Sequence, residues 1–317
     1  MCTCLDIKGI NHYFGRSLDL DYHYNEECVI TPRGYKLSLA SGDIHTKYAI
    51  IGTAMVVDSM PFYYEAVNER GLCIAGLNFP YNATFNKPNA SKLNLAISDI
   101  IPYFLSKYER VSELRIELAR VNITDEARMG MPLASLHFMI SDGSDTIVVE
   151  QGRSGLRVYE NPYGVMTNNP PFELQIKNLS KYEKATNSYI EADDLSYTCV
   201  GNGTNGLPGG FSSPDRFVKA AFLRKNASLN GSEYENAYEY FHMMDSIAMI
   251  DNMVLNKLNK PEISYYISCI NATRGLYYYK TYTNNEIKCI SLNEGNINSE
   301  VLTRFPLDYE YSIKKLN

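Results

Sequence analysis

Residues 1–20 read MCTCLDIKGINHYFGRSLDL, and this stretch decides how the rest of the chain is interpreted. The short runs Leu5–Ile7 and His12–Phe14 are separated by glycine and polar residues, a pattern typical of neighbouring strands. Charged residues interrupt the apolar positions, so the stretch does not resemble a secretory signal peptide. We therefore expect a protein that stays in the cytoplasm and begins with β-strands.

The second residue, Cys2, has the most informative position in the chain. Methionine aminopeptidase removes Met1 when the residue that follows is small, and the cysteine then carries a free α-amino group. An α-amine has a pKa of about 7.7–8 and a cysteine thiol one of about 8.5, so the amine can act as the base for its own thiol. Many proteins carry cysteine here without using it, and on this feature alone that ordinary interpretation is favoured.

Two charged residues follow in the same stretch, within Gly15–Asp19. An arginine such as Arg16 can stabilise a nearby thiolate, and a carboxylate such as Asp19 can hold an α-ammonium group. The alternative is an exposed ion pair at the end of a strand, which is common and weakly stabilising. The pair strengthens the case for a reactive Cys2 without deciding it.

The composition is that of a globular protein with a sizeable core. Of the 317 residues, 45% are hydrophobic and 21% are charged. The net charge is −6 and the lysines and arginines are scattered, so we expect no nucleic-acid partner. No apolar run reaches the roughly 18 residues that a membrane-spanning helix requires, so we expect no membrane partner either.

Two apparent cofactor or metal signals carry little weight. Gly201–Gly206 fits the dinucleotide pattern G-x-G-x-x-G, but the Pro and Gly residues of Leu207–Gly210 would break the helix that such a motif opens. The five histidines and seven cysteines never fall at a usual metal-ligand spacing. We predict an enzyme without a metal or cofactor, in which Cys4 is a packed neighbour of Cys2.

Strand signals fill both ends of the chain, and helical patterns lie between them. Apolar residues at spacings of three and four predict helices at Leu93–Lys107, Val111–Arg120, Phe217–Arg224 and Tyr234–Ile250. Pro102 is expected to kink or interrupt the first of them. Further strands are predicted at Val29–Thr31, Tyr48–Gly52, Leu72–Leu77, Ser135–Ser141, Thr146–Gln151, Gly164–Thr167, Ser264–Ile270, Leu276–Thr281 and Glu286–Ser291. This order predicts an α+β layered fold in one domain that covers residues 1–317.

Several sequence blocks stand in a fixed order along the chain. They are Met1–Thr3, His12–Asp19, Ile30–Arg33, Asn68–Leu72, Ala75–Pro80, Gly164–Pro170, Gly206–Gly209 with Arg216–Phe217, and Gly275–Tyr279. In this order they resemble the choloylglycine hydrolase family, which includes bile salt hydrolases and penicillin V acylases. One block would be weak support, whereas the ordered set is highly specific. The resemblance implies the four-layer αββα fold of N-terminal-nucleophile hydrolases and a homotetramer.

The resemblance also implies catalytic roles for three residues near the N-terminus. Cys2 would be the nucleophile, and its α-amine would be the base. Asp19 would orient that amine, and Arg16 would lie beside the sulfur. A chain whose N-terminus is blocked or unprocessed is then expected to be inactive.

Three later residues complete the implied site. Asn78 and Asn168 would contribute to the oxyanion site and to positioning, and Arg216 would support the charged centre. A tetrahedral oxyanion needs fixed donors, and the loss of one donor costs on the order of 10²–10³ in kcat. The implied reaction has two steps, in which the thiolate first expels an amine from an amide and water then hydrolyses the thioester.

The substrate class follows less directly from the resemblance. Asn78 resembles the bile salt hydrolase type, since penicillin V acylases tend to carry tyrosine there, and this favours glycine- or taurine-conjugated bile salts. The apolar cleft that a steroid needs would be lined by Leu18, Tyr64, Met129 and Met131. The alternatives are a penicillin V acylase, an N-acyl-homoserine-lactone acylase and, with less support, a non-enzymatic binder.

Overall fold

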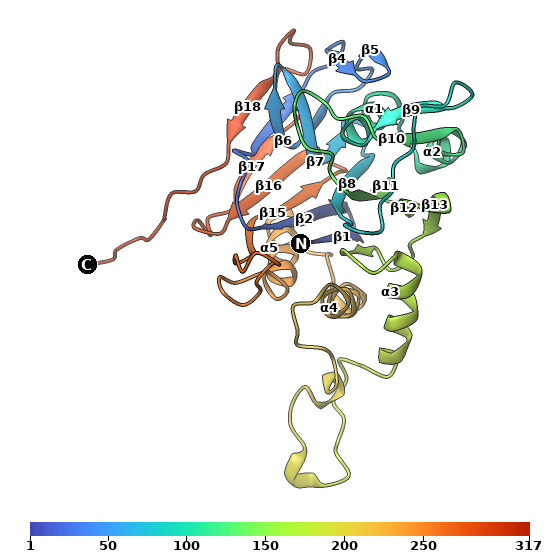
Figure 1. Cartoon of the computed structure of the whole chain (residues 1–317). Helices are drawn as coiled ribbons and strands as arrows, with labels where there is room; N and C mark the ends of the chain where they lie inside the picture. Colours follow the sequence, from blue (N-terminus) through green and yellow to red (C-terminus); the bar gives the residue numbers. More distant parts are fainter.

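Two large β-sheets form the centre of the molecule in the computed structural model, which describes residues 1–317 (Figure 1). The first sheet has six strands in the order β14 (Val165–Met166), β1 (Cys2–Lys8), β2 (His12–Leu20), β15 (Ile263–Asn271), β16 (Leu276–Thr281) and β17 (Lys288–Ser291). The second has eight strands in the order β13 (Gly155–Glu160), β12 (Thr146–Gly152), β11 (Leu136–Ser141), β8 (Cys73–Asn78), β7 (Met60–Asn68), β6 (Ile50–Val57), β3 (Glu27–Thr31) and β18 (Thr303–Pro306). Neighbouring strands of both sheets run antiparallel.

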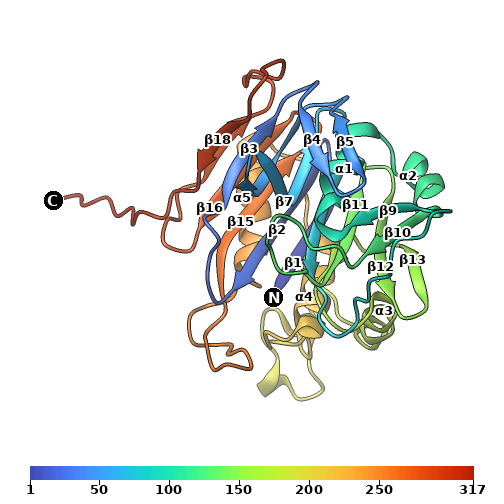
Figure 2. The ribbon, with the colours of Figure 1, turned by 45° about the horizontal axis from the view of Figure 1, so that its top comes forward.

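Helices cover the outer face of each sheet, while β1 and β2 of the first sheet contact β8 of the second. On the second sheet, α1 (Ile100–Lys107) packs on β7 and β8, and α2 (Val111–Leu118) belongs to the same apolar cluster. On the first sheet, α4 (Ser213–Asn226) packs on β1 and β14, α5 (Glu233–Asp245) on β15, and α3 (Phe172–Leu179) on α4. Figures 1 and 2 show the two helical layers on opposite sides of the paired sheets. The order helix, sheet, sheet, helix confirms the predicted four-layer α+β fold.

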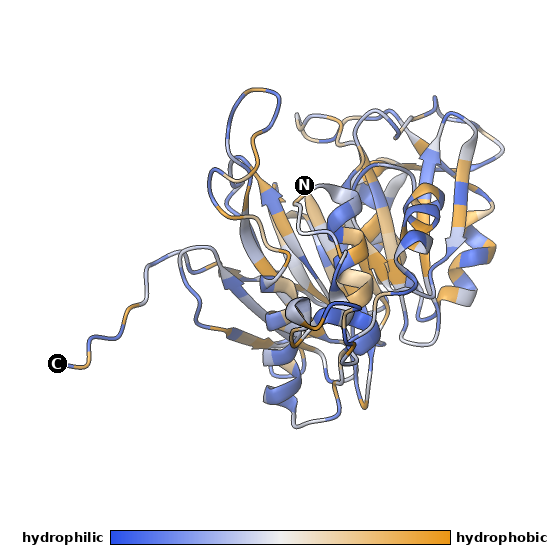
Figure 3. Cartoon of the chain, turned by 90° about the horizontal axis from the view of Figure 1, so that it is seen from below, coloured by the Kyte–Doolittle hydropathy of each residue, from blue (hydrophilic) through white to orange (hydrophobic).

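The central strands β1 and β2 are buried along almost their whole length. Both of their faces are covered, one by the second sheet and one by helices, so polar and apolar residues do not alternate along them. Figure 3 shows the hydrophobic positions concentrated on the strands between the layers. At Gly15, β2 passes so close to β15 that a Cβ atom would overlap the carbonyl oxygen of Ser268. The start of the chain is therefore a rigid, buried platform.

The segment predicted as one helix, Leu93–Lys107, is divided between two elements. Leu93–Ala96 forms β9, which pairs in parallel with β10 (Val121–Thr124), and a short 3₁₀ turn then leads into α1. The prediction of a helix from residue 93 is wrong, because the pairing with β10 is a non-local interaction that outweighs local spacing. Pro102 lies in the first turn of α1, where its missing N–H costs no hydrogen bond, and the helix continues through it.

The other predicted helices are present as α2, α4 and α5, although α5 ends at Asp245 rather than near residue 250. The predicted strands are present, but β2 continues to Leu20 rather than ending at Phe14, and β6 continues to Val57 rather than ending at Gly52. The elements that the sequence patterns did not indicate include α3, the long strand β7, and the hairpin of β4 (Lys36–Leu39) and β5 (Gly42–His45).

An arm of residues 183–212 projects from the body between α3 and α4 (Figure 1). The only regular structure in the arm is short 3₁₀ turns. The Gly201–Gly206 pattern lies in the arm and contains one of these turns, Asn202–Thr204. The glycine pattern therefore opens no α-helix here. Elsewhere, no helix of the chain combines the length and the apolar character needed to cross a bilayer.

Candidate active site

The thiol of Cys2 is buried at the start of β1, in the interior of the first sheet. Its Sγ atom accepts a hydrogen bond from Nη2 of Arg16. Met1 still precedes it, and the Met1 ammonium group donates to the carbonyl oxygen of Asp19 and to the carboxylate of Glu262. The structure thus shows the site with Met1 in place and with the thiol already beside an arginine.

Carbonyl oxygens from two sheets hold the side chain of Arg16, which is 1% exposed. Nη1 donates to the carbonyl oxygens of Gly76 at 2.5 Å and Tyr64 at 3.4 Å, and Nε donates to that of Ser17 at 3.1 Å. Burial opposes the charge, but the Cys2 sulfur and other acidic groups nearby outweigh burial and raise the pKa of Arg16. The guanidinium therefore stays charged next to the thiol.

A buried carboxylate, Glu65 of β7, lies behind Arg16. Its Oε2 is 3.8 Å from Nε of Arg16, and its two oxygens accept O–H bonds from Tyr266 at 2.7 Å and Tyr277 at 2.6 Å. Burial raises the pKa of Glu65, although Arg16 and the tyrosines oppose this effect. No sequence motif indicates Glu65. The sequence marks it only as a single acidic residue within the apolar run Met60–Asn68.

Asn168 and Arg216 both reach the backbone of Cys2. Oδ1 of Asn168 accepts the N–H of Cys2 at 2.7 Å and an Nη2–H of Arg216 at 2.9 Å. Nη1 of Arg216 donates to the carbonyl oxygen of Cys2 at 2.6 Å. The amide nitrogen of Asn168 donates to the carbonyl oxygen of Asn78 at 2.7 Å, so both ends of this side chain are engaged.

Asp19 carries an oxygen that lacks a hydrogen-bond donor. Oδ1 accepts the hydroxyl of Ser264 at 2.6 Å, whereas Oδ2 is buried, has no hydrogen-bond partner and lies 3.9 Å from Nη1 of Arg216. Burial lowers the pKa of Arg216, and the charge of Asp19 opposes this shift. Buried polar atoms are normally hydrogen-bonded, so this oxygen marks a place for one more donor in the cluster.

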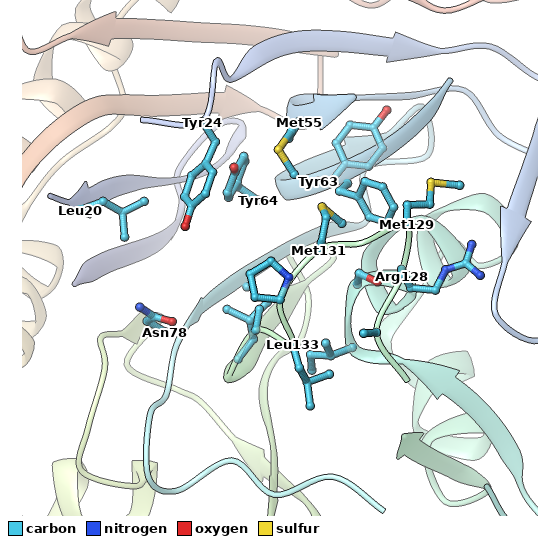
Figure 4. Close-up of a pocket in the computed structure, with 18 of the residues that line it drawn as sticks. Leu20, Tyr24, Met55, Tyr63, Tyr64, Asn78, Arg128, Met129, Met131 and Leu133 are labelled. Carbon is cyan, nitrogen blue, oxygen red and sulfur yellow. The ribbon is translucent and has the colours of Figure 1, made fainter. Parts of the chain in front are cut away.

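Asn78, at the end of β8, completes the set of predicted catalytic residues. Its carbonyl oxygen binds Asn168, while its side chain lines an open cavity beside Cys2 (Figure 4). The structure therefore brings all six predicted catalytic residues into one linked cluster. Among them, Asn78 is the one with an exposed side chain.

The cavity has a volume of about 410 Å³ and is lined mostly by hydrophobic residues. Cys2 and Arg16 are among its lining residues, and the loop of residues 126–134 forms its outer wall. The four predicted wall residues, Leu18, Tyr64, Met129 and Met131, all lie on its surface. Lining residues that the sequence did not indicate include Leu20, Tyr24, Met55 and Leu133 (Figure 4). Phe62 lines the cavity as well.

Arg128 fastens the loop of residues 126–134 to the body of the protein. Its guanidinium points away from the cavity (Figure 4), donates to the carbonyl oxygen of Ser38 and lies 3.7 Å from Oδ1 of Asp99. Asp99 is fully buried, and its Oδ2 accepts the N–H of Ala40 at 2.7 Å. Burial raises the pKa of Asp99 to about 6, although Ala40 and Arg128 oppose this shift.

Cys4 lies two residues along β1 from the nucleophile candidate and is fully buried. Burial raises the pKa of the Cys4 thiol, so this group stays protonated and packs as a small apolar residue. No group of three or more His, Cys, Asp and Glu side chains is arranged to hold a metal ion. Of the two neighbouring thiols, Cys2 alone contacts a cation.

A thiol that draws on its own terminal amine needs a cation at its sulfur and acceptors around its nitrogen. Cys2 has this division of contacts, and it lies on the αββα sandwich that is the fold of N-terminal-nucleophile hydrolases. The chain belongs to the choloylglycine hydrolase family, since the profile of linear amide C–N hydrolases, choloylglycine hydrolase family, matches residues 2–305. It is therefore a hydrolase that acts on linear amide C–N bonds.

Known proteins resemble the chain over its full length. It is 37% identical to the bile salt hydrolase/transferase of Lactiplantibacillus plantarum, with 100% of both chains covered. The structure of a variant of the conjugated bile acid hydrolase from Clostridium perfringens matches with a TM-score of 0.92 at 32% identity, again with 100% of both chains covered. Penicillin V acylase from Agrobacterium tumefaciens has a TM-score of 0.79 at 19% identity over 96% of this chain and 91% of its own, and shares the fold.

Proposed function

We propose that this chain hydrolyses the amide bond of glycine- or taurine-conjugated bile salts, with Cys2 as the nucleophile after removal of Met1. The main support is the contact of Arg16 with the Cys2 sulfur on the surface of the apolar cavity, where a bound acyl group would meet that sulfur. The relative with 37% identity over the full chain is named as a bile salt hydrolase/transferase, which supports the same substrate class.

Removal of Met1 would convert the peptide nitrogen of Cys2 into a primary amine. Two acceptors are available to it: Oδ1 of Asn168, which is 2.7 Å from this nitrogen, and Oδ2 of Asp19, which has no partner. A peptide nitrogen has one N–H and an ammonium group has three, so the processed N-terminus supplies the donors that Asp19 lacks. We infer that Asp19 and Asn168 orient this amine as the catalytic base.

In the first step, the amine takes the proton of the Cys2 thiol, and the thiolate, held by Arg16, attacks the amide carbonyl carbon. A C–S bond forms while the carbonyl electrons move to the oxygen. The exposed side chain of Asn78 is placed to donate to this oxyanion, whereas Asn168 is already engaged and serves in positioning. The C–N bond then breaks, and the protonated amine of Cys2 gives its proton to the leaving nitrogen.

In the second step, the same amine takes a proton from water, which attacks the thioester carbonyl carbon. The C–S bond breaks, the free acid leaves, and Arg16 stabilises the departing thiolate of Cys2. Because one amine performs both proton transfers, a chain that retains Met1 would carry out neither step.

The cavity suits a rigid apolar acyl group. Its volume of about 410 Å³ and mostly hydrophobic wall resemble the surroundings that bind small apolar ligands in other proteins. Met129 and Met131 add flexible thioether side chains, which can adapt to the face of a steroid. The hydroxyl groups of Tyr24 and Tyr64 supply polar contacts on the same wall.

One panel of substrates tests the proposal. Processed protein, checked by intact mass, is incubated with glycocholate, taurocholate, penicillin V and an N-acyl-homoserine lactone. We expect the highest kcat/KM with a conjugated bile salt. No release of glycine or taurine would overturn the bile salt assignment, and a higher kcat/KM with penicillin V or the lactone would assign the alternative acylase. Retained Met1 together with an unreactive Cys2 thiol would indicate a non-enzymatic binder.

We further propose that the enzyme works in the cytoplasm as a homotetramer with one catalytic domain per copy. The projecting arm of residues 183–212 supports this, because it exposes large apolar side chains at Tyr189, Ile190, Leu195, Tyr197 and Val200. An apolar surface of this kind is typical of an interface between proteins. Sedimentation of the intact protein tests the assembly, and a monomer at micromolar concentration would overturn it. Cell fractionation tests the location.

A further inference from the structure

The ammonium group of Met1 occupies a small site of its own. It donates to the carbonyl oxygen of Asp19 and to Oε2 of Glu262, the latter at 2.6 Å. The side chains of Met1 and Glu262 are 28% and 17% exposed, so this contact is largely shielded from solvent. A carboxylate combined with a carbonyl oxygen suits a primary ammonium group, which has three N–H donors and one positive charge.

This site adjoins both the catalytic nitrogen and the substrate cavity. Three covalent bonds separate the nitrogen of Met1 from that of Cys2, so the two atoms lie within about 4 Å of each other. Leu20, which lines the cavity, pairs across the sheet with Ile263, the residue directly after Glu262. An ammonium group bound there lies next to the proposed base, at the edge of the proposed acyl-binding cavity.

Removal of Met1 takes away the donor that these two acceptors share. The new α-amine of Cys2 does not replace it, because the Cys2 nitrogen lies three bonds away and is held by Oδ1 of Asn168. The proposed reaction supplies a donor of the same kind. Cleavage of the amide releases a primary amine, which takes up a proton in neutral water and becomes an ammonium ion.

We propose that the Glu262 carboxylate and the Asp19 carbonyl oxygen form an ammonium-binding site for the amine half of the reaction. The site holds the amine that leaves and, in a transfer reaction of the kind for which the relative from Lactiplantibacillus plantarum is named, the acceptor amine that attacks the thioester. This inference rests on the acyl-enzyme of the proposed function, but it does not depend on which acyl group Cys2 carries.

The transfer step balances without any other reactant. The bound ammonium ion gives one proton to the free α-amine of Cys2, and the nitrogen lone pair then attacks the thioester carbonyl carbon. The C–N bond forms, the C–S bond breaks, and a second proton passes from the attacking nitrogen to the Cys2 thiolate. The products are an amide and the thiol form of the enzyme, and no atom is oxidised or reduced.

The partition of the acyl-enzyme between water and an added amine tests this site. Processed enzyme reacts with glycocholate at increasing concentrations of ethylamine, and the new amide and the free acid are quantified by mass spectrometry. Glu262→Gln keeps the shape of the side chain and removes its charge. We expect the half-saturating concentration of ethylamine to rise roughly tenfold, because a charge-assisted hydrogen bond becomes a neutral one.

Two controls separate a local effect from a general one. Hydroxylamine attacks the same thioester but is uncharged near neutral pH, so its partition should not respond to Glu262→Gln. Asp251→Asn removes an exposed carboxylate from the segment between α5 and β15 and should alter neither partition. Intact mass confirms that each variant has lost Met1.

An unchanged ethylamine partition in Glu262→Gln would overturn the ammonium site, as would an equal loss with ethylamine and hydroxylamine. If glycocholate is not cleaved, the same partition is measured with whichever amide of the substrate panel forms the thioester. The bile salt assignment and the ammonium site can therefore fail independently of each other.

Discussion

The floor of the cavity and its outer wall are built in different ways. The floor consists of β1 and β2, which are buried on both faces, and its charged group, Arg16, donates hydrogen bonds to backbone carbonyl oxygens of β2, β7 and β8. The wall is the loop of residues 126–134, which contains no helix or strand and depends on the contacts of Arg128 with Ser38 and Asp99. Changes in the floor should therefore reduce kcat, and changes in the wall should alter KM.

The largest effect is expected from the nucleophile itself. Cys2→Ala removes the sulfur while the small side chain still allows Met1 to be removed, and kcat should fall by at least about 10⁴ because no thioester can form. Release of glycine from glycocholate measures the loss. Cys4→Ala is the matched control, since burial keeps this second thiol protonated, and it should keep most of the activity. An active Cys2→Ala protein would remove the proposed mechanism.

Substitution of Arg16 should affect both the activity and the stability of the floor. Arg16→Met removes the cation beside the sulfur, and we expect kcat to fall on the order of 10²–10³. It also leaves Glu65 buried without its cation, which should lower the free energy of unfolding by about 3–5 kcal/mol. Urea denaturation and steady-state kinetics measure the two effects separately.

The double variant Arg16→Met with Glu65→Gln sharpens this test. The neutral amide can still bond Tyr266 and Tyr277, so most of the lost stability should return while the activity stays low. Activity that returns together with stability would mean that Arg16 only balances Glu65 and does not act on the sulfur.

The residues around Cys2 also differ in how well the sequence predicted them. The candidate catalytic residues were identifiable because they lie in short ordered blocks, and the structure brings those blocks together at Cys2. Glu65 was missed because its partners Tyr266 and Tyr277 come from β15 and β16, and only the packing of the two sheets brings them close. Glu262 was missed for a similar reason, since it meets Met1 only after β15 pairs with β2.

The prediction of secondary structure was wrong where a non-local strand pairing outweighed the local spacing of apolar residues. Leu93–Ala96 has apolar residues that fit the start of a helix, but it forms β9 because β10 is available beside it. The four predicted lining residues of the cavity were found through the family positions. Leu20 and Tyr24 were not found, because nothing in their local sequence indicates that they line a cavity. Patterns in a sequence thus indicate residues that act through local motifs better than those that act through sheet packing.

The anchor of the wall should respond to pH. Asp99 has an ordinary pKa of about 3.9 in the unfolded chain and one of about 6 when folded, so the folded state holds the proton more tightly. The cost of burying the charge is fully present above about pH 6 and is relieved as the pH falls from about 6 to about 4. Asp99→Asn avoids this cost and can still accept the N–H of Ala40.

We therefore expect Asp99→Asn to gain about 1–3 kcal/mol of stability relative to the wild type at pH 7.5 compared with pH 4.5. Urea denaturation of both proteins at the two pH values measures the difference. Asp251→Asn, at an exposed carboxylate between α5 and β15, is the control for general charge effects. A stability difference that does not depend on pH would mean that the pKa of Asp99 does not change on folding, and that burial of Asp99 does not weaken the anchor of the wall.

The smallest effect is expected from the side chains of the wall. Met131→Ala removes apolar contact with the bound acyl group, which is worth about 1 kcal/mol, so KM for glycocholate should rise about two- to fivefold while kcat stays constant. Met253→Ala changes an exposed methionine that does not line the cavity and should leave both constants unaltered. The contrast between floor and wall depends on a change in KM that leaves kcat constant. A fall in kcat in Met131→Ala comparable to that in Arg16→Met would mean that the loop positions the reacting carbonyl and belongs with the catalytic floor.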